Sequence, residues 1–119
     1  MAEQPIPSTD LDCYRDETPA WSFPITRGGV AVDLDAAGVS LAWYLCASLA
    51  DEDADALETK TLGSGLTIPT PDSGIVQAAL DADDTAADGL PSAMYHRLVL
   101  TESTRKTIVA RGRLFILEA

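Results

Sequence analysis

The fold is decided by the stretch Trp21-Ser22-Phe23-Pro24-Ile25-Thr26-Arg27-Gly28-Gly29-Val30-Ala31-Val32-Asp33-Leu34. Apolar residues alternate with other residues on both sides of an Arg-Gly-Gly break, and such alternation across a glycine turn predicts a β-hairpin. Pro24 cannot donate a hydrogen bond to a ladder, so its strand is expected at a sheet edge or at a bulge. The positions expected to face the core are Trp21, Phe23, Ile25, Val30, Val32 and Leu34.

Similar alternating runs continue along the chain, whose 119 residues are enough for one domain. We expect residues 1–10 to form an N-terminal arm and residues 11–119 to form the domain. The run at 39–47 is apolar on both faces, which is typical of a central strand. The run at 57–62 is polar, and its Glu58 and Lys60 suit an exposed face or an edge. Further strands are expected at 11–15, 66–68, 75–80, 93–101 and 106–117.

The last of these runs alternates along its whole length. Its predicted inner side consists of Ile108, Ala110, Gly112, Leu114 and Ile116, and its other side of Thr107, Val109, Arg111, Arg113, Phe115 and Leu117. One short helical turn is expected near 82–88, because an Asp cap, an Ala-rich segment and a closing Gly occur there. The pattern predicts an all-β protein, a single β-sandwich of about seven or eight antiparallel strands.

The order of these motifs is specific. An aromatic strand ending in Ile-Thr-Arg-Gly-Gly is followed by Val-Ala-Val-Asp-Leu-Asp-Ala-Ala-Gly-Val-Ser-Leu. Then come Gly-Leu-Thr-Ile, Gly-Ile-Val-Gln and Asp-Ala-Asp-Asp-Thr-Ala, and a hairpin of Tyr-His-Arg-Leu-Val-Leu and Val-Ala-Arg-Gly-Arg-Leu-Phe-Ile-Leu closes the chain. Over roughly residues 11–117 the sequence resembles the small immunoglobulin-like (Ig-like) β-sandwich domains of tailed-phage virions, which include the amino-terminal domains of baseplate upper proteins. The resemblance implies a non-enzymatic virion structural protein of the tail, baseplate or fibre-attachment region, with head decoration or the neck as other placements.

Charge is unevenly distributed along the chain. The net charge of −11 argues against direct nucleic-acid binding, which needs clustered Lys and Arg. Residues 1–96 carry three basic and seventeen acidic residues, whereas 97–119 carry five basic and two acidic ones. This division suggests docking on other virion proteins or on further copies of the chain. The candidate interaction surface comprises Pro24, Arg97, Arg111, Arg113, Asp51, Asp53 and Asp55.

The acidic loop at 51–55 partly matches the pattern of a calcium-binding loop. Asp51, Asp53 and Asp55 have the spacing of the first ligands of a calcium loop. The pattern then fails, because Ala56 stands where Gly is needed and Leu62 where a bidentate Glu belongs. A solvated acidic loop is the better interpretation, and we expect neither a metal nor another cofactor.

Catalytic chemistry finds little support in the sequence. His96, the sole histidine, lies mid-strand among Met94 and Leu98 and is expected to pack in or beside the core. Cys13 and Cys46 are the two cysteines, and both are expected to be free structural thiols. We therefore expect no enzyme.

Carbohydrate binding is the main alternative function. β-Sandwiches can bind sugars through exposed aromatic side chains, and Tyr14 is the aromatic residue expected to be exposed, while both tryptophans should be mostly core. The longest apolar run, at 39–47, is far shorter than the ~20 residues of a membrane-spanning helix. No signal peptide is visible, so we expect synthesis in the host cytoplasm and a final place in the virion.

Overall fold

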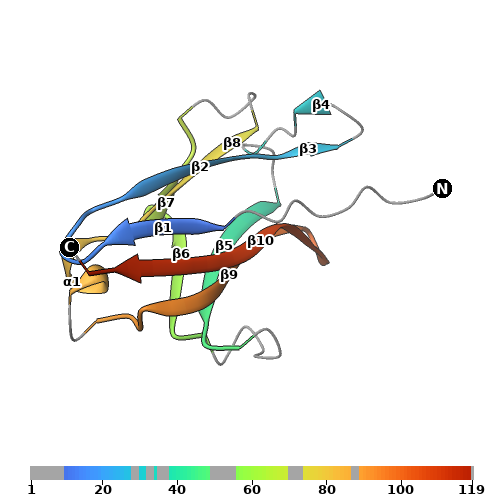
Figure 1. Ribbon diagram of the computed structural model, residues 1–119. Helices are drawn as coiled ribbons and strands as arrows, with labels where there is room; N and C mark the ends of the chain where they lie inside the picture. Colours follow the sequence, from blue (N-terminus) through green and yellow to red (C-terminus); the bar gives the residue numbers. More distant parts are fainter. Residues whose placement is uncertain are drawn as a thin grey trace.

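The computed structural model describes residues 10–27, 30–31, 34, 38–48, 56–69, 74–86 and 89–118. These residues are mostly in strands and form a curled, mixed eight-stranded sheet with one short helix (Figure 1). The strand order in the sheet is β1-β10-β9-β5-β6-β7-β8-β2. The elements are β1 (Leu11–Tyr14), β2 (Ala20–Pro24), β3 (Thr26–Arg27), β4 (Val30–Ala31), β5 (Val39–Cys46), β6 (Glu58–Leu62), β7 (Gly65–Thr67), β8 (Ile75–Ala79), α1 (Ala82–Thr85), β9 (Ala93–Glu102) and β10 (Arg105–Leu117).

The expected all-antiparallel pairing is wrong for two of the pairs. β1 runs parallel to β10, with Leu11 opposite Leu114, and β6 runs parallel to β7, with Leu62 opposite Leu66. After β1 the chain crosses to β2 at the other end of the sheet order instead of turning back on itself. Between β6 and β7 the short Gly63-Ser64 link displaces the chain sideways without reversing it.

The opening stretch does not form the long hairpin that its pattern predicts. β2 pairs with β8 over five residue pairs, from Ala20 opposite Ala79 to Pro24 opposite Ile75. Among the described residues of this stretch, the hairpin consists of β3 and β4, which join through two residue pairs. A distant strand offers β2 a longer ladder than the adjacent segment does, and sequence periodicity cannot identify that partner. The expected edge position of Pro24 is confirmed, because β2 ends the sheet order.

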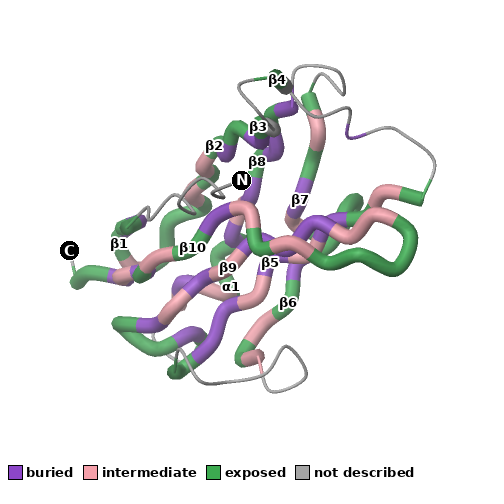
Figure 2. Tube along the Cα trace, turned by 90° about the vertical axis from the view of Figure 1, so that its right-hand side faces the viewer, coloured by how far each residue is buried: buried purple, intermediate pink, exposed green. Residues whose placement is uncertain are grey.

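The sheet curls until its inner faces meet. β2 and β5 are four places apart in the sheet order, yet the Trp43 ring on β5 lies 6.0 Å from Trp21 and 6.3 Å from Phe23, both on β2. Phe23 also lies 5.8 Å from His96 on β9. The two end strands, β1 and β2, come near each other (Figure 1). Buried residues consequently line the inside of the curl (Figure 2).

Most of the expected core positions are buried. Trp43 and Leu45 are fully buried on the central strand β5, and His96 is 2% exposed, as the sequence predicts. Trp21 is only partly buried and packs against the core cluster. The prediction for Val30 is wrong, because its side chain is 69% exposed. Neither cysteine forms a disulfide, and both are buried. Residues 1–9 and the loop at 51–55 lie outside the described residues, so the arm and the three loop aspartates are not placed.

A β-bulge divides β10 and changes its predicted sidedness. The register with β9 shifts between Ile108 and Ala110. From Ala110 to Ile116 the predicted inner positions are correct, but Ile108 is 37% exposed and Val109 packs against the core instead. One extra residue in a strand reverses the faces beyond it, so uninterrupted alternation fails there.

The short helix forms where its cap was expected. The Asp84 amide donates to the Asp81 side chain over 3.0 Å, and the Asp81 amide donates to the Asp84 side chain over 3.1 Å. This reciprocal capping box satisfies two backbone donors at the helix start. The α-helix ends at Thr85, and residues 87–88 of the expected turn lie outside the described residues.

Candidate interaction surface

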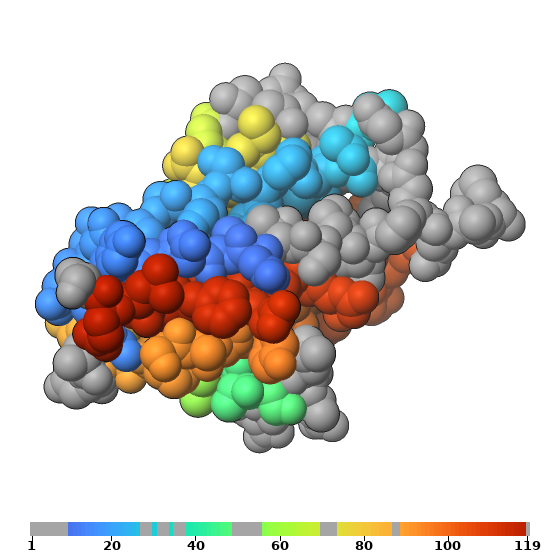
Figure 3. All heavy atoms as spheres, viewed as in Figure 1, coloured from blue at the N-terminus to red at the C-terminus, as the bar shows by residue number. Residues whose placement is uncertain are grey.

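Three arginines predicted from the charge pattern lie together on the outer side of the sheet. Arg97 on β9 stands opposite Tyr44 on β5 and opposite Arg111 on β10. Two residues farther along β10, on the same side of the sheet, Arg113 lies opposite Tyr95 of β9. We call this surface the arginine–tyrosine face and define it by Tyr44, Tyr95, Arg97, Arg111, Arg113 and Phe115. The outer surface of β10 lies between those of β1 and β9 (Figure 3).

The bulge in β10 explains why these side chains point outward. Beyond it, Ala110, Leu114 and Ile116 face the core and are at most 5% exposed. Because side chains alternate along a strand, the residues between them face away from the core. Arg111 and Arg113 are exposed and Phe115 is half-buried, in agreement with that alternation.

Ring contacts hold two of the arginines against the sheet. The Arg97 guanidinium carbon lies 5.9 Å from the centre of the Tyr44 ring, and that of Arg113 lies 5.9 Å from the centre of the Phe115 ring. Both distances fall within the range of cation–π attraction. The Arg113 amide also donates to Oδ1 of Asp10 over 3.0 Å, and its Nη2 lies 3.9 Å from Oδ2 of the same residue. Flat aromatic and guanidinium groups therefore cover much of this face.

Like charges stand next to one another on the face. Arg97 and Arg111 are direct cross-strand partners in β9 and β10. Like charges placed directly opposite each other destabilise a sheet. Asp10 forms an ion pair with Arg113, and the Arg113 side chain is 59% exposed and that of Asp10 52%. Such exposed pairs contribute little to stability. A carboxylate brought by a partner would be attracted to the exposed side chains of Arg111 and Arg113.

An open hollow adjoins this face at Tyr44. Its volume is about 310 Å³. Hydroxyl groups and one lysine provide most of its polar lining. The lining residues are Ser40, Leu41, Ala42, Tyr44, Thr61, Leu62, Thr101 and Lys106. The hollow extends the arginine–tyrosine face across β5 toward β6.

Of the remaining members of the predicted surface, Pro24 lies within the described residues and is not brought to this face. Pro24 is on β2, paired with Ile75 of β8, whereas the arginines are on β9 and β10. The loop aspartates at 51, 53 and 55 lie outside the described residues. Tyr14, expected to be exposed, is 49% exposed on β1, and Leu117 of β10 is its register partner.

The prediction for Lys60 is wrong. Its strand β6 lies inside the sheet between β5 and β7, and Lys60 is opposite Trp43 on the core side with 8% exposure. Its Nζ donates to Oδ2 of Asp84 over 2.7 Å and lies 3.8 Å from a carboxylate oxygen of Glu58. Burial by itself lowers the pKa of Lys60, but the hydrogen bond and charge of Asp84 outweigh it, so the pKa lies above its ordinary value.

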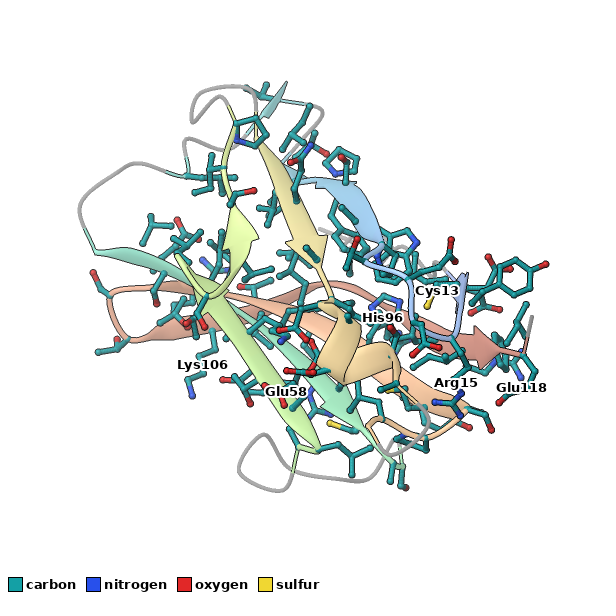
Figure 4. The ribbon with its side chains drawn as sticks, turned by 90° about the vertical axis from the view of Figure 1, so that its left-hand side faces the viewer. Cys13, Arg15, Glu58, His96, Lys106 and Glu118 are labelled. Atoms are coloured by element: carbon teal, nitrogen blue, oxygen red, sulfur yellow. The ribbon has the colours of Figure 1, made fainter. Side chains whose placement is uncertain are left out.

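Arg15 is a second structural cation that the sequence did not reveal. Its Nη1 donates to the carbonyl oxygens of Ala86 and Leu90 over 3.1 and 3.0 Å. Its Nε donates to Oε1 of Glu118 over 3.0 Å. Figure 4 shows Arg15 beside Glu118, with Lys106 toward the opposite end of the molecule. Arg15 thus joins the segment after β1 to the segment after α1 and to the end of β10.

Cys13 is one of the two buried thiols. Burial raises the pKa of the Cys13 thiol, and the charges of Glu17 and Asp12 raise it further, which disfavours the thiolate. Among the described residues no group of three or more His, Cys, Asp or Glu side chains could hold a metal ion. In the same residues no helix is long and apolar enough to cross a membrane.

Comparison with known proteins returns no match, either to protein-family models or to curated proteins.

Proposed function

We propose that this protein is a non-enzymatic bacteriophage virion component, an Ig-like β-sandwich module that attaches through its arginine–tyrosine face. The sheet order supports the Ig-like part of the proposal: β1-β10-β9-β5-β6 would be one layer and β7-β8-β2 the other. Contacts of Trp43 and His96 with Phe23 would then be contacts between the two layers. The tail, baseplate or fibre-attachment region is the proposed place, as the sequence resemblance implies.

The observation that carries the docking role is the composition of the arginine–tyrosine face. Tyr and Arg are enriched at protein–protein interfaces and among their energetically dominant residues. Here Tyr44, Tyr95 and three arginines occupy adjacent positions on three paired strands. Strands hold such side chains in fixed relative positions, which lowers the entropy lost on binding. The partner would be another virion protein or another copy of the chain.

The virion role is tested by purifying particles from the strain that encodes the chain. Gradient-purified particles should contain the protein at a constant number of copies per major capsid protein, measured by quantitative mass spectrometry. A phage-encoded protein known to stay out of particles serves as the control for contamination. Recovery of the chain only in the soluble fraction would overturn the proposed virion role.

A carbohydrate-binding module is the second candidate, and the hollow beside Tyr44 is the observation that favours it. Hydroxyl groups of Ser40, Thr61 and Thr101 line that hollow together with the Tyr44 side chain. Sugar hydroxyls pair with such groups while a sugar ring packs on an aromatic side chain. Saturable binding on an array of host-surface glycans, abolished by Tyr44→Ala, would favour this function over protein docking.

A further inference from the structure

The arginine–tyrosine face is positively charged, whereas the rest of the protein carries an excess of negative charge. Arg111 and Arg113 are exposed on β10, and Lys106 is exposed farther along the same strand. Arg97 adds a fourth cation opposite Arg111. The chain as a whole has a net charge of −11, so the rest of its surface is strongly acidic. The face and the remaining surface are therefore opposite in sign.

A symmetric contact through the arginine–tyrosine face is electrostatically unfavourable. In a two-fold dimer the same patch meets itself. The Arg97–Arg111 pair of one copy would then approach the same pair of the other, and two exposed Arg113 side chains would be added. Like-charge contacts of this kind cost several kcal/mol at an interface. The occupant of the face must instead present carboxylates.

Exposed carboxylates surround the short helix. We call this surface the α1 end and define it by Asp16, Glu17, Asp81 and Asp83, all four exposed. The Asp16 amide donates to the carbonyl oxygen of Thr85 over 3.3 Å, and Thr85 Oγ1 donates to that of Glu17 over 2.6 Å. These bonds hold the segment after β1 against α1, so the four carboxylates belong to one surface.

The neighbouring cations are bonded to other carboxylates, although the charge of Lys60 also acts on Asp81. Lys60 is buried and bonded to Asp84, 2.7 Å away. The Arg15 side chain is 13% exposed and bonded to Glu118, 3.0 Å away. Both positive charges are thus held below the surface by other carboxylates. The exposed part of the α1 end is left acidic.

We infer that the arginine–tyrosine face of one copy binds the α1 end of a second copy. The two surfaces differ, so the contact is head-to-tail and repeats from copy to copy, giving a closed ring or an open filament. This inference rests on the proposed function in taking the face as a docking surface, and it specifies the partner. Arg97, Arg111 and Arg113 would meet the carboxylates of Asp16, Glu17 and Asp83, with the aromatic rings forming the apolar part of the contact.

Two variants separate the surfaces. Arg111→Glu/Arg113→Glu reverses the charge of the face. Asp16→Asn/Glu17→Gln/Asp83→Asn removes three of the four negative charges of the α1 end, and Asp81 is kept because its side chain caps α1. The geometry is preserved: Asn tolerates the positive φ of 67° at position 16, and Gln retains an acceptor for the Tyr14 amide, which donates to Glu17 over 2.7 Å. Arg105→Glu, at the exposed start of β10, is the matched control for charge reversal.

The test is sedimentation velocity of the purified full chain across a concentration series. The wild type and Arg105→Glu should associate at low ionic strength and dissociate in about 1 M salt, where the Debye length is about 3 Å. Each surface variant alone should stay monomeric with an unchanged melting temperature. Mixed together, the two variants retain one intact face and one intact end between them, so they should form a 1:1 dimer and nothing larger.

The inference is overturned if the wild type stays monomeric at every concentration, if its association is insensitive to salt, or if either variant associates as the wild type does. Failure of the mixture to form the dimer overturns it as well. None of these outcomes bears on whether the chain is present in particles, which the particle assay measures separately.

Discussion

Trp43 on β5 donates its indole N–H to Nδ1 of His96 on β9 across 3.2 Å, with both side chains buried. This bond explains how a histidine is accommodated on a strand face that otherwise carries Met94, Leu98 and Leu100. In the part of the chain that the structure describes, every buried side-chain nitrogen or oxygen has a partner. The histidine therefore serves the core of the curled sheet by accepting a hydrogen bond from the indole N–H.

Replacing His96 with Leu should remove the acceptor and leave the Trp43 N–H unsatisfied in the core. Such a loss costs about 1–3 kcal/mol, measured as the change in free energy of unfolding by urea. Trp43→Phe removes the donor, and the double variant completes a thermodynamic cycle. A favourable coupling of the two sites is expected. Strictly additive effects would contradict a direct bond between them.

Replacing Lys60 with Met should destabilise the fold, because it leaves the Asp84 carboxylate, 12% exposed, without its 2.7 Å partner. We expect a loss of about 2–3 kcal/mol in the free energy of unfolding. Lys106→Met, at an exposed position of β10, is the control and should cost little. Equal effects of the two substitutions would contradict a structural role for the Lys60–Asp84 pair.

The Lys60–Asp84 pair also predicts that the stability of the fold falls at alkaline pH. The pKa of Lys60 is raised above its ordinary value of 10.5 in the folded protein. Its contribution is therefore fully present below pH 10.5 and is lost as pH rises through the raised value. The stability difference between the wild type and Lys60→Met should shrink over that alkaline window. A difference that stays constant there would contradict the assignment.

Gly65 and Gly63 form a matched pair that separates steric clash from backbone strain. Both have positive φ, 102° and 82°, where an Ala side chain is strained. A Cβ on Gly65 would meet the aliphatic stem of Lys60 at 2.6 Å, whereas a Cβ on Gly63 would meet nothing within 4 Å. Gly65→Ala should therefore lower the melting temperature more than Gly63→Ala. Equal losses in melting temperature would show that the Lys60 side chain can move away from the new Cβ without a cost in stability.

The lowered pKa of Asp81 predicts that the stability of the fold depends on pH in the acid range. The bond that its side chain accepts from the Asp84 amide, together with the charge of Lys60, holds the pKa of Asp81 below its ordinary value of 3.8. Its charged form stabilises the fold above pH 3.8, and the contribution is lost as pH falls through the lowered value. Asp81→Asn keeps a capping side chain without the charge. The advantage of the wild type over this variant should disappear in acid, and Asp12→Asn on β1 is the control.

The row of strands could be predicted from local alternation because each strand carries its own pattern of inward and outward residues. The edge position of Pro24 followed from the missing amide, and the burial of His96 from its apolar neighbours. Pairing partners could not be predicted in this way. The β2–β8 ladder joins Trp21 to Ala78, and nothing local to the opening stretch marks that distant strand.

The candidate surface could be predicted only in part, because it depends on which strands pair and in which register. Alternation placed Arg111 and Arg113 on one side of the last strand, but only the register with β9 brings Arg97 opposite Arg111. The burial of Lys60 depends on α1, which brings Asp84 within 2.7 Å of its ammonium group. Single-residue irregularities such as the bulge between Ile108 and Ala110 leave no clear signal in the pattern.

The proposal that the arginine–tyrosine face attaches the protein to a particle is tested most directly by counting copies per particle. Particles would be grown with the wild type, with Arg111→Glu/Arg113→Glu or with the control Arg105→Glu, and the chain quantified against the major capsid protein. We predict that the face variant folds with an unchanged melting temperature but is depleted from particles, while the control is incorporated normally. Incorporation of the face variant at the wild-type copy number would contradict the account.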